Sequence, residues 1–156
     1  MAYINFEFFE EVYGSVDIPE AEFNRLLWNA EKDINDATTG IDGYKKLQRA
    51  FPTDEYTSEA VKRCVCELVH LRHELENISK GESTANGIRP AVISSVSAGN
   101  ESISYAVQNT AISAAAVDKN LQVKLYRDTV REYLSGLSDA NGVNLLYMGE
   151  YPRGLE

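Results

Sequence analysis

The chain of 156 residues has few residues of several kinds and no long apolar stretch. It contains two cysteines, two histidines, one tryptophan and four prolines. No stretch approaches the roughly 20 apolar residues that a membrane helix needs, and the first residues lack the basic flank and cleavage pattern of a signal peptide. We therefore expect a cytoplasmic protein that folds around one core and makes no membrane contact.

Disulfides are not expected either. Cys64 and Cys66 lie two residues apart in a segment whose pattern predicts a helix. Their side chains would diverge by about 200°, so they cannot bridge each other. With 44% hydrophobic residues, the chain can bury roughly 68–70% of its unfolded surface without a disulfide or a metal. The pattern is typical of a reducing compartment.

Basic residues are scarce as well. The chain has 15 lysines and arginines against 24 acidic residues, a formal net charge of −9. Such a balance argues against a surface built to neutralise nucleic-acid phosphates or anionic lipid. Most of the excess negative charge belongs to residues 1–78, which contain 8 basic and 16 acidic residues. We expect an acidic face from the N-terminal half.

The spacing of apolar residues predicts a mainly α-helical fold, a small bundle of about four to five helices. Asn5 can cap the first helix, and Pro19 suits the first position of the second. Thr57 or Ser58 can cap the long fourth helix. The expected helices cover about residues 5–13, 19–36, 43–50, 57–77 and 114–137.

A β-hairpin is expected inside this bundle, over about residues 91–107. Val92–Ser97 and Ser102–Val107 are rich in β-branched residues, and Gly99-Asn100 between them is a turn signal. An isolated hairpin is barely stable in water, so this one must dock on its own domain or on a neighbour. Ile103 and Tyr105 are therefore candidate subunit-interface residues.

The last predicted helix has two apolar stripes. Val123, Tyr126 and Val130 share one side with later apolar residues, and a second stripe lies well around the helix from them. Two apolar sides imply burial on two sides, which a small monomer can rarely give its last helix. The second stripe supplies further candidate interface residues: Val117, Leu121 and Leu125.

Residues 138–156 mix glycine and proline with apolar side chains. This composition is too apolar for an ordinary disordered tail and too broken for a helix. We expect one helical domain over residues 1–137, followed by an extended C-terminal tail, 138–156, that orders on a partner. Its candidate docking residues are Val143, Leu145, Leu146, Tyr147, Met148 and Tyr151.

Catalytic chemistry has one weak candidate. Spacings of four and three place Cys66, His70 and His73 on one face of the long helix, opposite its core stripe, as a metal-dependent or hydrolytic enzyme would need. Sites built from one helix lack a closing ligand, and such residues more often belong to a solvated or interface face. No nucleophile-elbow or phosphate-cradling glycine motif accompanies them. We expect no enzyme, no cofactor and no bound metal.

Two further residues leave alternatives open. Trp28 lies off the apolar stripe of its helix, where it either packs under the N-terminal helix, the favoured interpretation, or anchors an interface. Arg72 falls within the apolar arc of the long helix. It either extends along the surface to water or pairs with an acidic group of a neighbouring subunit.

Four phrases of the sequence follow one another in an order that resembles a known family. They are Met-Ala-Tyr-Ile-Asn-Phe-Glu-Phe-Phe-Glu-Glu-Val-Tyr-Gly from residue 1, Ile-Pro-Glu-Ala-Glu-Phe-Asn-Arg-Leu-Leu from residue 18, Glu-Ala-Val-Lys-Arg-Cys-Val-Cys-Glu-Leu from residue 59, and the serine-rich expected hairpin. In these phrases the chain resembles the head-tail connector (adaptor, or head completion) proteins of tailed bacteriophages and prophages. The resemblance covers nearly the whole chain and includes no catalytic signature.

The resemblance implies a structural virion protein. Twelve copies would form a ring beneath the portal vertex and link the DNA-filled head to a stopper or tail-completion protein. Genome DNA would pass through the channel without specific binding. The C-terminal segment, here residues 141–151, would reach the portal protein, and the hairpin would contact adjoining subunits. The location implied is the neck of the virion, with the host cytoplasm during assembly.

A second interpretation does not need a ring. The chain could be a stand-alone helical protein-protein interaction module of a prophage that binds one cellular partner through its tail. Stoichiometry separates the two, because a ring needs many copies with closed symmetry and a module needs one or two. The acidic surface fits the ring, since a weakly repulsive channel wall lets a polyanion slide past.

Overall fold

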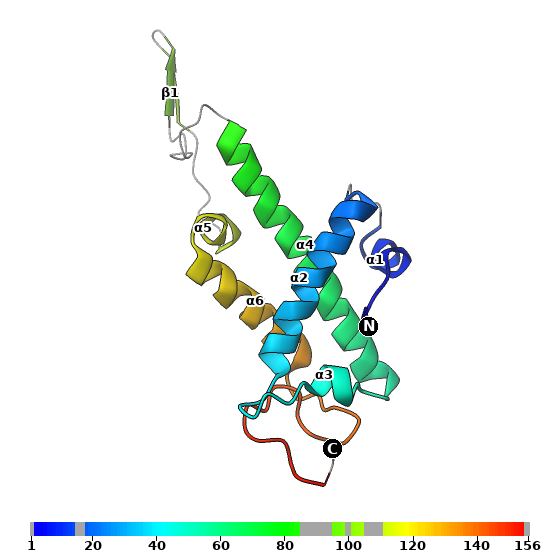
Figure 1. Ribbon diagram of the computed structural model, residues 1–156. Helices are drawn as coiled ribbons and strands as arrows, with labels where there is room; N and C mark the ends of the chain where they lie inside the picture. Colours follow the sequence, from blue (N-terminus) through cyan, green and yellow to red (C-terminus); the bar gives the residue numbers. More distant parts are fainter. Residues whose placement is uncertain (1, 15–17, 85–94, 99–100, 105–110, 155–156) are drawn as a thin grey trace. The chain divides into compact units, whose positions relative to one another are not determined.

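A computed structural model describes residues 2–14, 18–84, 95–98, 101–104 and 111–154 (Figure 1). The described part is mainly α-helical, which confirms that part of the predicted fold class. Its helices are α1 (Phe6–Tyr13), α2 (Glu20–Thr38), α3 (Lys46–Arg49), α4 (Glu55–Thr84), α5 (Ala111–Val117) and α6 (Lys119–Leu134).

The chain divides into two compact units, but not at the predicted boundary. One unit combines Met1–His73 with Lys124–Glu156, and the other is Glu74–Val123. The segment 138–156, expected as an arm outside a domain of residues 1–137, thus belongs to the same unit as the N-terminal helices.

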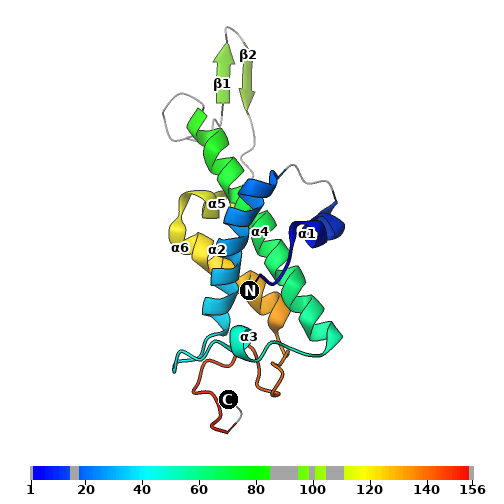
Figure 2. The same cartoon turned by 45° about the vertical axis from the view of Figure 1, so that its right-hand side comes forward.

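In the first unit, α1 is capped as predicted. The Asn5 side-chain oxygen accepts a hydrogen bond from the backbone N–H of Phe8 at 2.9 Å. The N–H groups of a first helical turn have no acceptor within the helix, and this bond supplies one of them with an acceptor. Phe6 and Phe9 turn toward α2, where both rings lie 5.2 Å from the Phe23 ring. The aromatic side chains of α1 therefore attach it to α2. Figure 2 shows the ribbons of α1, α2 and α4 in this unit.

The core of the first unit combines the stripes predicted for α2 and α4. Phe23, Leu26, Ala30 and Ile34 of α2 are almost wholly buried, and so are the core positions of α4 up to Leu71. These stripes are confirmed. Their burial follows from apolar residues recurring every three or four positions, which gives each helix one continuous apolar side.

Helix α4 begins and ends differently from the prediction. The Asp54 carboxylate accepts a hydrogen bond from the Thr57 backbone N–H at 3.0 Å, so Asp54 provides the cap expected from Thr57 or Ser58. The Thr57 hydroxyl and backbone N–H hold the pKa of Asp54 below its usual value. The helix continues to Thr84, past the end predicted near Asn77.

Arg72 on α4 adopts neither of the two expected arrangements. Its Nε donates to Asp33 Oδ2 on α2 at 2.9 Å, and its guanidinium lies 4.4 Å from the ring centroid of Tyr126 on α6. The acidic partner therefore belongs to the same subunit. Arg72 connects three helices of the first unit through one half-buried side chain.

The second unit contains the end of α4, α5, the start of α6 and two short strands. Strand β1 (Ser95–Ala98) pairs antiparallel with β2 (Glu101–Ser104), with Val96 opposite Ile103. Gly99 and Asn100, where a turn is predicted, lie outside the described residues, as do the flanking residues and Tyr105. The hairpin over 91–107 stays a prediction.

The continuous helix predicted over residues 114–137 is wrong in detail, because α5 and α6 meet at Asp118. The Asp118 carboxylate accepts a hydrogen bond from the Asn120 backbone N–H at 2.7 Å and caps α6. An aspartate can break a helix in this way because its short side chain competes for backbone donors.

Candidate functional site

The predicted metal or catalytic set is not assembled as a site. Cys66 is fully buried, so it does not share a solvated face with the two histidines. The His70 ring stacks on Tyr13 of α1, with ring centroids 4.8 Å apart, and His73 Nδ1 lies 3.8 Å from Glu22 on α2. Within the described ranges, no three histidine, cysteine or acidic side chains converge as ligands for a metal ion.

The face of α4 that was expected to be solvated is instead covered by α1. The Tyr13 hydroxyl donates to the Glu67 carboxylate, one turn from His70. Burial, reinforced by this carboxylate, raises the pKa of Tyr13. Together with the stacked rings, this bond fixes the C-terminal end of α1 on α4. The polar residues in this region therefore connect helices.

Burial makes both cysteines poor nucleophiles. It raises the pKa of the Cys66 thiol to about 12 and raises that of Cys64 as well. Only the thiolate reacts at a useful rate or binds metal. At neutral pH, Cys64 and Cys66 are therefore small apolar residues of the core.

This state of the thiols can be measured with a chromogenic disulfide reagent at pH 7. We expect fewer than about 0.1 thiols per chain to react within minutes in the folded protein, because both sulfurs are buried and protonated. Both thiols should react after unfolding in guanidinium, which is the internal control. Rapid reaction of one thiol in the folded protein would contradict the burial of that cysteine.

The C-terminal segment is folded onto its own chain. Leu145 is 0% exposed, and Val143 and Tyr151 are also buried. The Tyr151 ring stacks on Tyr44, with centroids 3.8 Å apart, and Val143 belongs to the same apolar cluster. The predicted extended conformation is therefore wrong for these residues. Val143, Leu145 and Tyr151 have a structural role in their own subunit, and the docking role predicted for them stays a prediction.

A buried lysine holds this segment in place. Lys46, at the start of α3, is 1% exposed, and its ammonium donates hydrogen bonds to the carbonyls of Thr38 and Leu145, each at 3.0 Å, and to that of Tyr147. Burial lowers the pKa of the ammonium, and the nearby Asp139 and Asp42 carboxylates oppose this effect. One side chain thus joins the end of α2 to the C-terminal segment.

Two aspartates complete the attachment. Asp42 accepts hydrogen bonds from the backbone N–H groups of Tyr151 at 2.7 Å and Tyr44 at 3.0 Å, which hold the pKa of its carboxyl below the usual value. Asp139 accepts from the Tyr151 hydroxyl at 2.6 Å and from the Val143 N–H at 2.9 Å. Burial, reinforced by Asp139, raises the pKa of Tyr151 to about 12.

Close backbone packing requires a glycine in the same region. A Cβ atom added to Gly40 would lie 2.5 Å from the carbonyl oxygen of Gly149, closer than two non-bonded atoms can approach. The turn around residue 40 therefore lies directly against the C-terminal segment. We name Asp42, Tyr44, Lys46, Asp139 and Tyr151 the tail anchor. Of these residues only Tyr151 was predicted from the sequence, and for a different role.

The remaining predicted docking residues are accessible. Tyr147 is 49% exposed, Met148 is 55% exposed, and Leu146 is half-buried. The backbone N–H of Ile41 donates to the Met148 carbonyl at 2.9 Å, and the Ile41 side chain is 82% exposed. An exposed apolar tip therefore combines Ile41, Tyr147 and Met148, with two of its residues taken from the predicted set.

The predicted subunit-interface residues differ in accessibility. Val117 is 72% exposed and Leu121 is 42% exposed, whereas Leu125 is half-buried. Ile103 lies in β2, and its side chain, like all of Tyr105, is outside what the structure describes. Val117 at the end of α5 and Leu121 at the start of α6, both from the second predicted stripe, are thus open to solvent.

Trp28 was expected to pack under α1, and this interpretation is wrong. Its side chain is 66% exposed on α2. A tryptophan at this exposure leaves a large apolar area in water, and tryptophan is among the residues most enriched at binding hot spots. The second interpretation, that Trp28 anchors an interface, stays a prediction.

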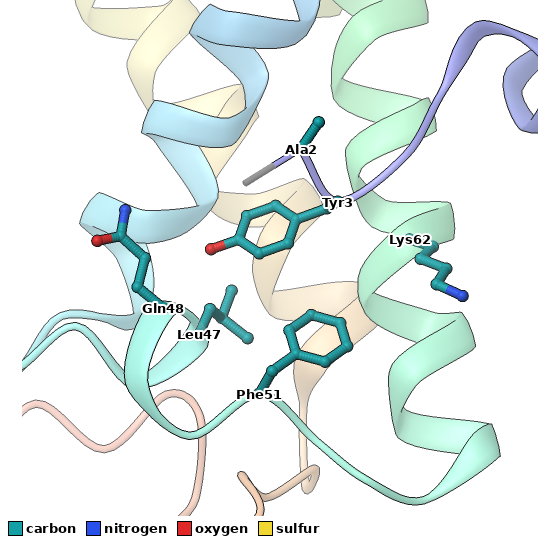
Figure 3. Close-up of a pocket in the computed structure, with 6 residues that line it drawn as sticks. All are labelled: Ala2, Tyr3, Leu47, Gln48, Phe51 and Lys62. Atoms are coloured by element: carbon teal, nitrogen blue, oxygen red, sulfur yellow. The ribbon is translucent and has the colours of Figure 1, made fainter.

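The first unit also has a hollow of about 460 Å³ beside its N-terminal segment (Figure 3). Tyr3 and Phe51 stack along it, 5.7 Å apart between ring centroids, and Lys62 is the only charged residue among the described residues that line it. The Tyr3 hydroxyl already donates to Asn35 at 2.8 Å. Among the described residues that line this hollow, no acidic residue or histidine accompanies Lys62, so they form neither a carboxylate or histidine acid-base pair nor a metal ligand set.

Comparison of the chain with models of protein families, with curated proteins and with solved structures found no match. In the described part of the chain, no helix combines the length and the apolar character needed to span a bilayer. On the described surface, Ile41, Tyr147 and Met148 expose apolar area, as do Val117 and Leu121, and such exposed apolar area can mark an interaction site.

Proposed function

We propose that this chain is a structural subunit of a phage or prophage head-tail connector (adaptor) ring, which docks under the portal vertex and links the DNA-filled head to the stopper or tail. The observation that carries the proposal is the exposure of Val117 and Leu121 on the side of the last helices predicted to meet a neighbour. The resemblance of the sequence and the mainly helical fold support the same function.

In the proposed ring, each subunit presents two different faces to its two neighbours. Val117, Leu121 and Leu125 contact one neighbour, and the hairpin with Ile103 and Tyr105 reaches an adjoining subunit. Such a head-to-tail interface closes into a ring when the rotation between copies divides a full turn. Twelve copies is the number that the resemblance implies.

In the proposed ring, the exposed apolar tip contacts the portal. Ile41, Tyr147 and Met148 extend from a rigid base, because the tail anchor fixes the backbone on which Tyr147 and Met148 lie. An ordered apolar tip loses less conformational entropy on docking than a disordered arm does. The stopper or tail-completion protein would bind elsewhere on the ring.

The net charge of −9 fits a channel that conducts DNA. An acidic wall repels phosphates weakly, so genome DNA passes without specific binding. The subunit would be found in the host cytoplasm during assembly and in the neck of the finished virion. Its proposed role needs no cofactor and no reaction.

Light scattering coupled to size-exclusion chromatography, over a wide concentration range and with portal protein added, tests this function. We expect a closed ring near twelve copies, in solution or on the portal. Leu121→Glu should abolish the ring, because it places a charge in an apolar contact, whereas Asn120→Glu at the exposed neighbouring position should not.

The portal contact is tested separately with Tyr147→Asp, which should reduce co-sedimentation with the portal while far-UV circular dichroism stays unchanged. A chain that binds only one or two copies of a single partner would support the interaction module instead. A chain that remains monomeric and does not bind the portal would contradict the connector function.

A further inference from the structure

A small hollow lies between the end of α2, α6 and the C-terminal segment of the first unit. Its volume is about 250 Å³, below the roughly 300–1,000 Å³ of small-molecule pockets. It therefore suits side chains of another protein better than a metabolite. We name it the α6 hollow; it is lined by Asp36, Ala37, Arg127, Val130, Arg131, Leu146 and Met148.

Two arginines supply positive charge at the α6 hollow. Arg127 and Arg131 are exposed, and a spacing of four places them on one side of α6, about 6 Å apart along the axis. In the described part of the chain, neither guanidinium has an ion-pair partner. Asp36, the acidic residue at the hollow, is already paired with Lys32 at 3.0 Å.

The complementary surface is on α1. Glu7, Glu10 and Glu11 are exposed and form a continuous acidic side, and α1 contains no basic residue. Glu7 and Glu11 have the same spacing of four as the two arginines. Of the ion pairs between described residues, none involves these three carboxylates.

The two surfaces cannot satisfy each other within one subunit. In both views, α1 lies on one side of the α2–α4 pair and α6 on another (Figures 1 and 2). Two different, complementary faces on one chain define a head-to-tail contact between copies. Like charges four residues apart also repel each other on each helix, and a complementary partner relieves both repulsions.

We propose that α1 of one subunit docks at the α6 hollow of the next, with Glu7 and Glu11 paired to Arg127 and Arg131. This inference rests on the proposed ring and identifies one of its contacts. Arginine and carboxylate form two parallel hydrogen bonds, which sets the register of the two helices. Phe8, half-buried on α1, is the apolar side chain beside the carboxylates that can reach the apolar floor of the hollow.

A second copy fits this site better than nucleic acid does. The arginines line a hollow with an apolar floor of Ala37, Val130 and Leu146, which a phosphate backbone would not use. The whole chain also repels a polyanion, with its net charge of −9. Met148 borders both the α6 hollow and the exposed apolar tip, so it lies where the neighbouring subunit and the portal would meet.

Charge reversal tests the contact in both directions. Arg127→Glu with Arg131→Glu, and separately Glu7→Arg with Glu11→Arg, should each weaken self-association about 100-fold or more, because each puts like charges opposite each other. An equimolar mixture of the two variants should assemble again. In a head-to-tail ring of alternating variants, each contact joins complementary faces. Assembly is measured as mass in solution or as copies bound per portal.

The control carries the same change in net charge as the double arginine variant, at a different place. Lys45→Glu with Arg153→Glu alters two exposed residues outside both surfaces and should assemble like the wild type. Two results would contradict this contact without contradicting the ring. In one, the folded reversal variants assemble normally. In the other, the wild type forms rings but the mixture of the two variants does not assemble. A wild-type chain that never assembles, alone or with portal, overturns both.

Discussion

Deleting residues 141–156 will remove most or all of the folding stability of the subunit. The deletion takes away Val143, Leu145 and Tyr151, which are buried in the first unit. A buried side chain of this kind contributes roughly 1.5–3 kcal/mol, so the three account for about 5 kcal/mol or more. The whole net stability of a domain is only roughly 5–15 kcal/mol. The deletion also removes two of the three carbonyls that accept from Lys46.

Urea unfolding followed by far-UV circular dichroism measures this effect. The matched control deletes residues 153–156 only, which leaves Tyr151 in place and removes the exposed Arg153 and Gly154. We expect the control to unfold within about 0.5 kcal/mol of the wild type, as surface changes usually do. If the chain ending at Ala140 unfolded at the wild-type urea concentration, the structural role of the segment would be refuted.

This expectation changes how a portal-binding experiment must be designed. A truncation that abolishes portal attachment has two explanations, because the subunit also loses its core. A point change at an exposed position separates them. Tyr147 is half exposed, so Tyr147→Asp changes the surface offered to the portal while Leu145 and Tyr151 remain buried.

The helices of the first unit were predictable because their signals are local. Asn5 caps α1 as expected, and the apolar stripes of α2 and α4 recur at three and four residues. Such signals need only the sequence within one or two turns. The end of α4 was predicted near residue 77, but the helix continues through Gly81 to Thr84. A single glycine lowers helix stability without forcing a helix to end.

The tail anchor was missed because its contacts span the chain. Lys46 bonds to Leu145, 99 residues later, and Asp42 bonds to Tyr151, 109 residues later. Asp42-Gly43, and Asp139 with Gly142 three residues later, are recognisable turn signals in the sequence. They predict turns, however, and not that the two turns meet. No local pattern marks a lysine that will be buried against carbonyl oxygens.

The candidate metal set failed for a related reason. Helical spacing correctly places Cys66, His70 and His73 on neighbouring turns of α4, but spacing alone does not reveal what covers a helix face. Tyr13 of α1 covers His70, and Cys66 is buried. Trp28 shows the opposite error, since a large apolar residue expected under α1 is exposed on α2. Both errors concern which helix packs on which face.

Replacing Lys46 with methionine will lower the stability of the subunit by roughly 3–5 kcal/mol. Methionine has a similar length but donates no hydrogen bond, so the carbonyls of Thr38, Leu145 and Tyr147 lose their shared donor. A hydrogen bond to a charged group contributes roughly 1.5–3 kcal/mol. The relief of no longer burying an ammonium offsets part of the loss of three such bonds.

The melting temperature should show this loss clearly. For a chain of this size, 1 kcal/mol corresponds to about 2–4 °C, so Lys46→Met should melt about 6–20 °C below the wild type. Lys45→Met is the matched control, because Lys45 is the adjacent residue and is exposed. It should melt within about 2 °C of the wild type.

A buried ion can also be replaced by an apolar residue at no cost when its partners find other donors or water. The three carbonyls at Lys46 belong to two segments far apart in sequence, the end of α2 and the C-terminal segment. Without the ammonium, their oxygens would face one another without a donor. If Lys46→Met melted at or above the wild-type temperature, the lysine would not be what joins the two segments, and stacking of Tyr44 on Tyr151 would have to account for the attachment.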